Sequence, residues 1–227
     1  MPTVNATAKI AKDGVNIITN QATKILVQAP AIEILIGGPY ISEGEEHTYG
    51  HVALRVVTAS DEHVYDFGRY AGERGPFGQG RLRVWTDFSK YIASENATGR
   101  TTTGFLYRVT SEAAKQVNAH FDGLIGDRPV LRAYANYRKE YRLAVDYHAL
   151  TNNCTTTSMG GARIAIKDLD YNGIKYNQGR GMSTAEQYAA KIAGWPTAIF
   201  MPADLKQMLE ENPAHRPDKV EKFGGSK

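Results

Sequence analysis

The chain of 227 residues contains a single cysteine, Cys154. One thiol excludes an internal disulfide and a zinc site built from several thiolates. A lone cysteine in a globular protein is often a small buried hydrophobe without chemistry of its own. If Cys154 does act as a nucleophile it must stay reduced, because the thiolate is the reactive form.

Long apolar runs and a large excess of one charge are also missing. No stretch approaches the ~20 apolar residues that cross a bilayer as a helix. With 27 basic and 24 acidic residues the formal net charge is only +3, which gives no electrostatic footprint for nucleic acid. We therefore expect no membrane span and no nucleic-acid partner.

The composition that is present is typical of a globular protein, with 42% hydrophobic and 22% charged residues. The length suits one substantial domain, and we find no internal repeat and no clear linker. We predict a single domain over residues 1–211, in which residues 1–23 form an irregular arm or a short strand. Residues 212–227 are charged and contain Gly and Pro, which predicts a flexible tail.

Hydrophobic patterning predicts an α+β protein. Strands are expected at 24–28, 32–36, 51–57, 63–67, 81–85 and 101–109, and 143–145 is a short strand or an extended entry to the Cys154 segment. Helices are expected at 111–125, 155–165, 184–193 and 202–210, and 88–100 is a loop or a short helix. Residues 41–48 are polar and acidic, which predicts an exposed loop, and the glycine-rich stretch 68–80 predicts a flexible loop near a cleft.

Residues 51–57 and 63–67 are joined by a short polar turn and predict a hairpin. Side chains alternate across a strand, so His51 and Ala53 share one face, and Val64 and Asp66 share a face of the returning strand. If Asp66 lies on the face of His51, its carboxylate can orient the imidazole. A slip of one residue would reverse every side chain, so the sequence leaves this register open.

Cys154 is followed by a run of small residues that predicts the helix at 155–165. Asn152 or Asn153 can cap this helix through its first free N–H groups. Cys154 would then lie at the positive end of the helix dipole, which favours an anion by roughly 0.3–1 kcal/mol, less than about one pKa unit. A thiol with a pKa of about 8.5 would stay mostly protonated at neutral pH. A catalytic role for Cys154 therefore requires a base.

Six histidines are candidates for this base, and His51 has the strongest setting because it opens a hydrophobic strand. The others lie in a loop, at a strand surface, inside a helix, too close to Cys154 in sequence, or in the tail: His47, His63, His120, His148 and His215. A lone histidine is more often structural than catalytic, so the pattern selects His51 without establishing it.

The order of these motifs is His51-Val52-Ala53-Leu54-Arg55-Val56, a turn, His63-Val64-Tyr65-Asp66, and far downstream Asn152-Asn153-Cys154 before a helix. This order resembles the circularly permuted branch of the NlpC/P60 papain-like superfamily, over roughly residues 34–166. In ordinary members the cysteine helix precedes the histidine strand. In permuted members, such as lecithin:retinol acyltransferase-like enzymes and a type VI secretion effector hydrolase, the histidine hairpin comes first. The turn before Asp66 is a few residues longer here than in that pattern.

The resemblance implies a papain-like permuted NlpC/P60 fold, in which an antiparallel sheet packs against the helix that carries Cys154. It implies a Cys-His-Asp arrangement in which Cys154 is the nucleophile, His51 the base and Asp66 the group that orients the imidazole. The backbone N–H of Cys154 is a natural oxyanion donor. Tyr147 and Asn153 are candidates for a second donor, although an ordinary packed tyrosine and a helix cap explain them equally well. No metal and no cofactor is required.

The resemblance also implies a substrate and a setting. Relatives of this kind often cut peptide bonds in peptidoglycan, so we expect an amidase or endopeptidase acting on peptidoglycan peptides. Residues 1–20 lack the features of a signal peptide, so we expect synthesis in the bacterial cytoplasm without one. The effector resemblance implies delivery to the periplasm of target cells, a secretion-apparatus component and a cognate immunity protein as partners. Two alternatives stay open: an acyl-lipid acyltransferase or phospholipase, and a non-catalytic binding module on the same scaffold.

Overall fold

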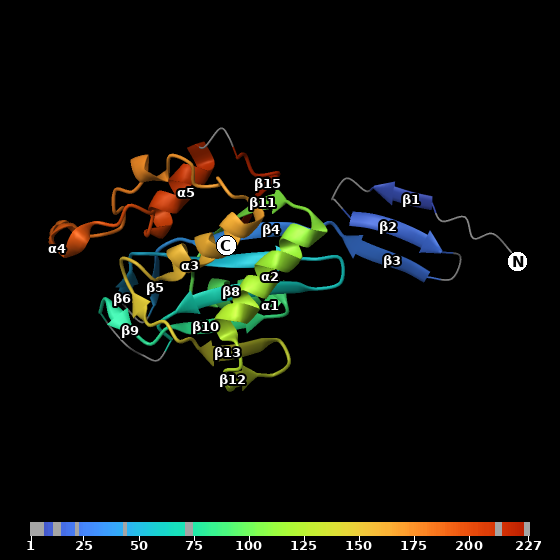
Figure 1. Cartoon of the computed structure of the whole chain (residues 1–227), viewed down its shortest axis with the longest axis horizontal. Coiled ribbons are helices and arrows are strands. Elements are labelled where there is room, and N and C mark those ends of the chain that lie inside the picture. Colours follow the sequence, from blue (N-terminus) through green and yellow to red (C-terminus); the bar gives the residue numbers. More distant parts are fainter. Residues whose placement is uncertain are drawn as a thin grey trace, which may run out of the picture.

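A large antiparallel sheet organises the protein. The structure is a computed structural model, and it describes residues 7–10, 15–20, 23–42, 45–70, 75–211 and 215–224. Its eight strands follow the spatial order β12-β13-β10-β8-β7-β4-β11-β15 (Figure 1). Their bounds are β4 (Ala31–Gly37), β7 (His51–Val57), β8 (Glu62–Gly68), β10 (Arg81–Trp85), β11 (Thr102–Arg108), β12 (Val130–Tyr134), β13 (Arg138–Arg142) and β15 (Lys219–Phe223). The predicted α+β class is confirmed, and so are the strands expected at 32–36, 51–57, 63–67, 81–85 and 101–109.

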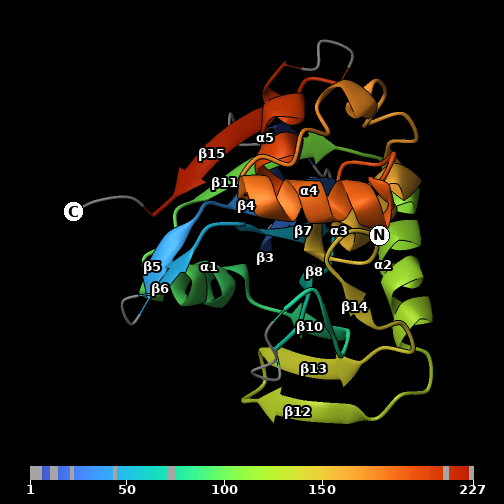
Figure 2. The same ribbon diagram turned by 90° about the vertical axis from the view of Figure 1, so that its left-hand side faces the viewer.

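Helices cover both faces of this sheet (Figure 2). Their bounds are α1 (Phe88–Ala97), α2 (Ser111–Ile125), α3 (Cys154–Ala165), α4 (Thr184–Gly194) and α5 (Pro202–Glu211), with a 3-10 turn at Gly173–Lys175. Side chains of α2, α3 and α5 pack on one face, and α1 packs on the other. The helices expected from the periodicity are therefore confirmed, and the segment after Phe88 is a helix rather than a loop.

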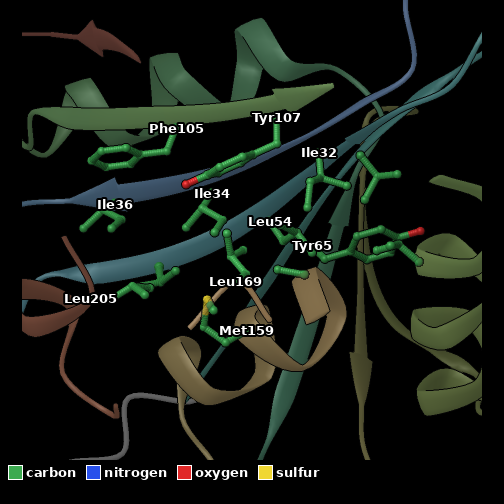
Figure 3. Close-up of a cluster of buried hydrophobic side chains, with 14 of the residues drawn as sticks. Ile32, Ile34, Ile36, Leu54, Tyr65, Phe105, Tyr107, Met159, Leu169 and Leu205 are labelled. Atoms are coloured by element: carbon green, nitrogen blue, oxygen red, sulfur yellow. The ribbon is translucent and has the colours of Figure 1, made fainter. Parts of the chain in front are cut away.

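Alternation along β4 and β7 explains why these strands form the centre of the fold. Ile34 and Leu54 face the core that α3 closes with Met159 (Figure 3). Leu35 and Ala53 face the opposite core beneath α1. Burying one Leu, Ile or Met side chain contributes about 1.5–3 kcal/mol. Both central strands are thus buried on two faces, which fixes the position of the loop ends that carry the site.

The hairpin register settles the question that the sequence left open. Ala53 pairs with Asp66 across β7 and β8. Residues directly opposite each other in an antiparallel pair point to the same side of the sheet, so Asp66 lies on the face of Ala53 and hence of His51. On the other side of β8, Asp66 pairs with Arg83 of β10.

Several segments differ from their predictions. Residues 1–23, expected as an irregular arm or a short strand, contain two strands, β1 (Thr7–Ile10) and β2 (Val15–Asn20). These form a separate antiparallel sheet with β3 (Thr23–Gln28), which confirms the strand expected at 24–28. The loop expected at 41–48 is wrong, because β5 (Tyr40–Ser42) pairs with β6 (Glu45–His47). Backbone hydrogen bonds hold such a hairpin, and a polar sequence gives no sign of them. Residues 1–6, 11–14, 21–22 and 43–44 lie outside the described part of the chain.

The prediction of a flexible tail over residues 212–227 is wrong for β15, which pairs with β11 at the edge of the central sheet. The Asp218 carboxylate accepts a hydrogen bond of 2.6 Å from the Arg108 N–H just before this strand. Phe223 packs edge-on against Phe88 of α1, with 5.2 Å between ring centroids. Residues 212–214 and 225–227 lie outside the described residues.

Two further strand pairs shape the approach to Cys154. The β12–β13 hairpin precedes it, and of the two alternatives for 143–145 the short strand is excluded because β13 ends at Arg142. Downstream, β14 (Tyr147–His148) pairs with β9 (Phe77–Gly78). This pairing brings the end of the glycine-rich stretch beside the residues that lead into α3, while its residues 71–74 are not described. Within the described chain, no helix has the length and apolar character needed to cross a membrane.

Candidate active site

Cys154 is the first residue of α3, and Asn153 caps this helix. The Asn153 side-chain oxygen accepts from the Thr156 N–H at 3.0 Å, and the Thr156 hydroxyl accepts from the Asn153 N–H at 2.9 Å. The prediction that Asn152 or Asn153 caps the helix is thereby resolved in favour of Asn153. Cys154 is partly exposed, with the positive end of the helix dipole beside its sulfur.

The remaining hydrogen-bonding groups of Asn153 are also engaged. Its amide nitrogen donates to the carbonyls of Ala149 at 2.6 Å and Phe200 at 3.0 Å, and the residue is 3% exposed. A primary amide has two N–H donors, so no proton is left for a substrate oxygen. Asn153 therefore positions the helix, and the sequence-based candidacy of its side chain as an oxyanion donor is not supported.

His51 is the first residue of β7 and lies where the end of the sheet meets the N-terminus of α3. Its side chain is hydrogen bonded to the Cys154 thiol. The backbone N–H of Val52 also bonds to this sulfur. The two residues that the sequence paired across about a hundred positions of chain are thus in contact.

Asp66 completes a row of three side chains. Its Oδ1 lies 2.5 Å from Nε2 of His51, and Asp66 is 3% exposed. Because Asp66 occupies Nε2, Nδ1 is the ring nitrogen left for the sulfur. A carboxylate in this position holds the imidazole in one orientation and stabilises its protonated form.

The charges of the three groups reinforce one another. Burial by itself lowers the pKa of His51, but the Asp66 carboxylate and the Cys154 sulfur raise it to about 10. Burial raises the pKa of Cys154, yet the His51 charge and its hydrogen bond lower it below the ordinary thiol value. Against burial, the same histidine lowers the pKa of Asp66 to about 2. These shifts favour a thiolate beside an imidazolium, with an ionised aspartate behind it.

A cleft of about 480 Å³ opens above Cys154. Its walls are mostly apolar and come from α4, from the segment before α5 and from residues 75–77 at the end of the glycine-rich stretch. His148 also lines it, but its Nδ1 accepts from the Leu150 N–H at 3.2 Å. His148 therefore lies at the cleft, but its ring is engaged in supporting the turn before Asn153.

Tyr147 lines the same cleft beside Cys154. Burial, and then the charge of Cys154, raise the pKa of its hydroxyl, so it keeps its proton. Arg69 donates a hydrogen bond to this hydroxyl, and its guanidinium lies 5.1 Å from the centre of the Tyr147 ring. The hydroxyl proton of Tyr147 therefore remains available to a bound substrate.

Sequence reasoning missed Tyr70, whose hydroxyl donates to Oδ1 of Asp66. It also missed Arg83, whose guanidinium carbon lies 3.4 Å from the centre of the Tyr70 ring. Tyr70 follows the end of β8 at Gly68 by two residues, and this position in the sequence gives no sign of its contact with Asp66. Arg83 had no local signal, because only the β8–β10 register brings it to Asp66.

The described part of the chain offers no group of three or more His, Cys, Asp or Glu side chains placed to hold a metal ion. Comparisons with family models, with curated proteins and with solved structures gave no match for this chain.

Proposed function

We propose that this protein is a cysteine hydrolase in which Cys154 is the nucleophile, His51 the base and Asp66 the residue that orients His51. The observation that carries the proposal is the row of hydrogen bonds from the Cys154 thiol through His51 to the buried Asp66, at the floor of a cleft. Charges that are buried without function cost stability. A thiolate–imidazolium pair open to a cleft is the arrangement that nucleophilic catalysis requires.

In this mechanism the Cys154 thiolate attacks the carbonyl carbon of an amide or ester, and a carbon–sulfur bond forms. The carbonyl oxygen becomes an oxyanion, which the backbone N–H of Cys154 and the Tyr147 hydroxyl stabilise. The His51 imidazolium gives its proton to the leaving nitrogen or oxygen as that bond breaks, which leaves a thioester. His51 then takes a proton from water, whose oxygen attacks the thioester. The acid product departs as the carbon–sulfur bond breaks, and the thiolate–imidazolium pair is restored.

The order of elements supports a permuted papain-like fold as part of this proposal. The histidine hairpin β7–β8 precedes the cysteine helix α3 in the chain, and α3 packs on the sheet that contains the hairpin. A papain-like site requires only that the nucleophile at a helix start meets a histidine on a strand, whichever comes first in sequence.

For the substrate, we propose a peptide amide of peptidoglycan, with delivery to a target cell as an antibacterial effector and a cognate immunity protein as partner. The support is the resemblance of the motif order to permuted NlpC/P60 hydrolases. The cleft favours a second candidate, an acyl lipid, because its walls are mostly apolar and an acyl chain binds such a wall by burial of its methylenes.

A thiol-reactive probe tests the chemistry without knowledge of the substrate. We expect native Cys154 to react with iodoacetamide faster than a free cysteine at pH 7, and His51→Ala to slow the reaction about tenfold or more. His63→Ala is the matched control, because His63 is on the same hairpin but contacts Asp61 and Tyr65 instead. Slow labelling that does not depend on His51 would favour the binding module instead.

The substrate is tested by incubating the protein with peptidoglycan sacculi and, separately, with phospholipid vesicles, using Cys154→Ser as the inactive control. Release of muropeptides without fatty acid supports the peptidoglycan amidase. Release of fatty acid alone assigns the site to acyl lipids and excludes the first candidate.

A further inference from the structure

Tyr70 contacts both members of the His51–Asp66 pair. Its hydroxyl donates to Oδ1 of Asp66, the same oxygen that binds Nε2 of His51. The hydroxyl oxygen also lies 3.3 Å from that nitrogen. The three polar atoms form a triangle, so displacement of the hydroxyl would release one of the two contacts that hold the carboxylate oxygen.

Arg83 stacks on the ring of Tyr70, and its guanidinium carbon is 3.4 Å from the ring centre. Nε of Arg83 donates to Glu140 at 2.9 Å, and Arg81 donates to the other oxygen of Glu140 at 2.8 Å. Glu140 is 1% exposed. The ion cluster of Arg81, Arg83 and Glu140 on β10 and β13 thus holds the Arg83 guanidinium against the Tyr70 ring.

The absence of a side chain at Gly68 makes room for the Tyr70 ring. A Cβ at position 68 would lie 2.9 Å from Cζ of Tyr70 and 3.0 Å from its hydroxyl oxygen. Carbon atoms do not approach so closely without displacement. Glycine at the end of β8 therefore permits the chain to fold Tyr70 back over Asp66.

We propose that Tyr70 is a positioning residue for the Cys154–His51–Asp66 site, held in place by Arg83 and admitted by Gly68. This inference rests on the proposed function. Tyr70 acts through Asp66: its hydroxyl restricts the carboxylate to the orientation in which Oδ1 accepts from His51. The ionisable groups around Asp66 are His51 on β7, Tyr70 after β8, Arg83 on β10 and, from α1, Tyr91.

The test measures the rate of Cys154 alkylation by iodoacetamide between pH 5 and pH 9, with thermal unfolding as a parallel readout. Because a misplacement of about 1 Å can cost about a hundredfold in rate, we expect Tyr70→Phe to slow alkylation at pH 6.5 about tenfold and to move the profile to higher pH. Gly68→Ala should slow alkylation and shift the profile in the same way, because the added methyl group displaces the Tyr70 hydroxyl, the group that Tyr70→Phe removes. The double variant should be no slower than either single one.

Tyr65→Phe is the matched control, because Tyr65 lies on β8, the strand that carries Asp66, and its hydroxyl donates to Asn118 at 3.0 Å on the opposite face. It should lower the unfolding temperature as Tyr70→Phe does and leave the alkylation profile unchanged. The inference is overturned if the Tyr70→Phe profile superimposes on that of the native protein while His51→Ala still slows alkylation. If His51→Ala itself has no effect, the proposed function fails first.

Discussion

At the scale of single residues, the site is a set of charges that are stable only together. The Cys154 thiol, the His51 ring and the Asp66 carboxyl are each disfavoured as ions by burial, and each is restored by its neighbour. Removing one member of a buried pair leaves the others uncompensated, which is more costly than the loss of the contact alone. Stability and reactivity should therefore depend on the same three residues.

Asp66 provides a prediction for stability. Its folded-state pKa of about 2 lies below the unfolded value of about 3.9, so its contribution is complete above pH ~4 and is lost as pH falls through about 2. The raised pKa of His51 contributes fully below its unfolded value of about 6.5 and is lost as pH rises through about 10. At pH 5.5 both are complete. We expect Asp66→Asn to lower the free energy of unfolding there by about 2 kcal/mol.

Urea unfolding at pH 5.5 and at pH 3 measures this effect. The difference between Asp66→Asn and the native protein should shrink at pH 3, because the carboxyl of the unfolded chain is then mostly protonated while the native one, with a pKa of about 2, is still largely ionised. A difference that is the same at both pH values would show that position 66 contributes through shape and not through charge.

At the scale of elements, the prediction from sequence succeeded where side-chain pattern determines structure. The sequence predicted the alternation of β4, β7 and β8 and the cap before α3. Three of these elements, β7, β8 and α3, carry the catalytic candidates His51, Asp66 and Cys154. The pairing of β5 with β6 and of β15 with β11 could not be predicted from side-chain pattern, because backbone hydrogen bonds and a free sheet edge determine them. The contact of Tyr70 with Asp66 was not predicted for a similar reason. It depends on a ring folded back over Gly68, and no sequence pattern indicates this.

The cap of α3 provides a prediction at this scale. Asn153→Ala removes the cap, which costs roughly 0.5–2 kcal/mol, and leaves the carbonyls of Ala149 and Phe200 without their donor. Each unsatisfied buried group costs about 1–3 kcal/mol more. We expect a total loss of about 3 kcal/mol in the free energy of unfolding, together with slower alkylation of Cys154 because the start of the helix shifts.

Ser183→Ala is the comparison for this variant, since Ser183 caps α4 with a similar capping box at an exposed position. Its loss should cost about 1 kcal/mol and leave alkylation unchanged. If the two variants have equal effects on denaturant midpoints, Asn153 is an ordinary cap and does not tie α3 to the segment before α5.

At the scale of the whole molecule, the site exists only because the sheet joins distant parts of the chain. Ala53 and Asp66 are placed by one hairpin, whereas Cys154 arrives after α1, β11, α2 and the β12–β13 hairpin. The register of the hairpin was undetermined by sequence, since both registers satisfy its alternation. In the assembled fold Ala53 pairs with Asp66, which places Asp66 on the side of the sheet that His51 shares.

The central claim is that the folded chain converts Cys154 into a thiolate by bringing His51 to it. The most direct measurement is the pH titration of thiolate ultraviolet absorbance, with Cys154→Ser as the blank. In the native protein the thiolate should form below the ordinary thiol pKa of about 8.5. In urea, and in folded His51→Ala, it should form at or above that value. A native titration that matches the unfolded chain, or one that His51→Ala leaves in place, would contradict the account.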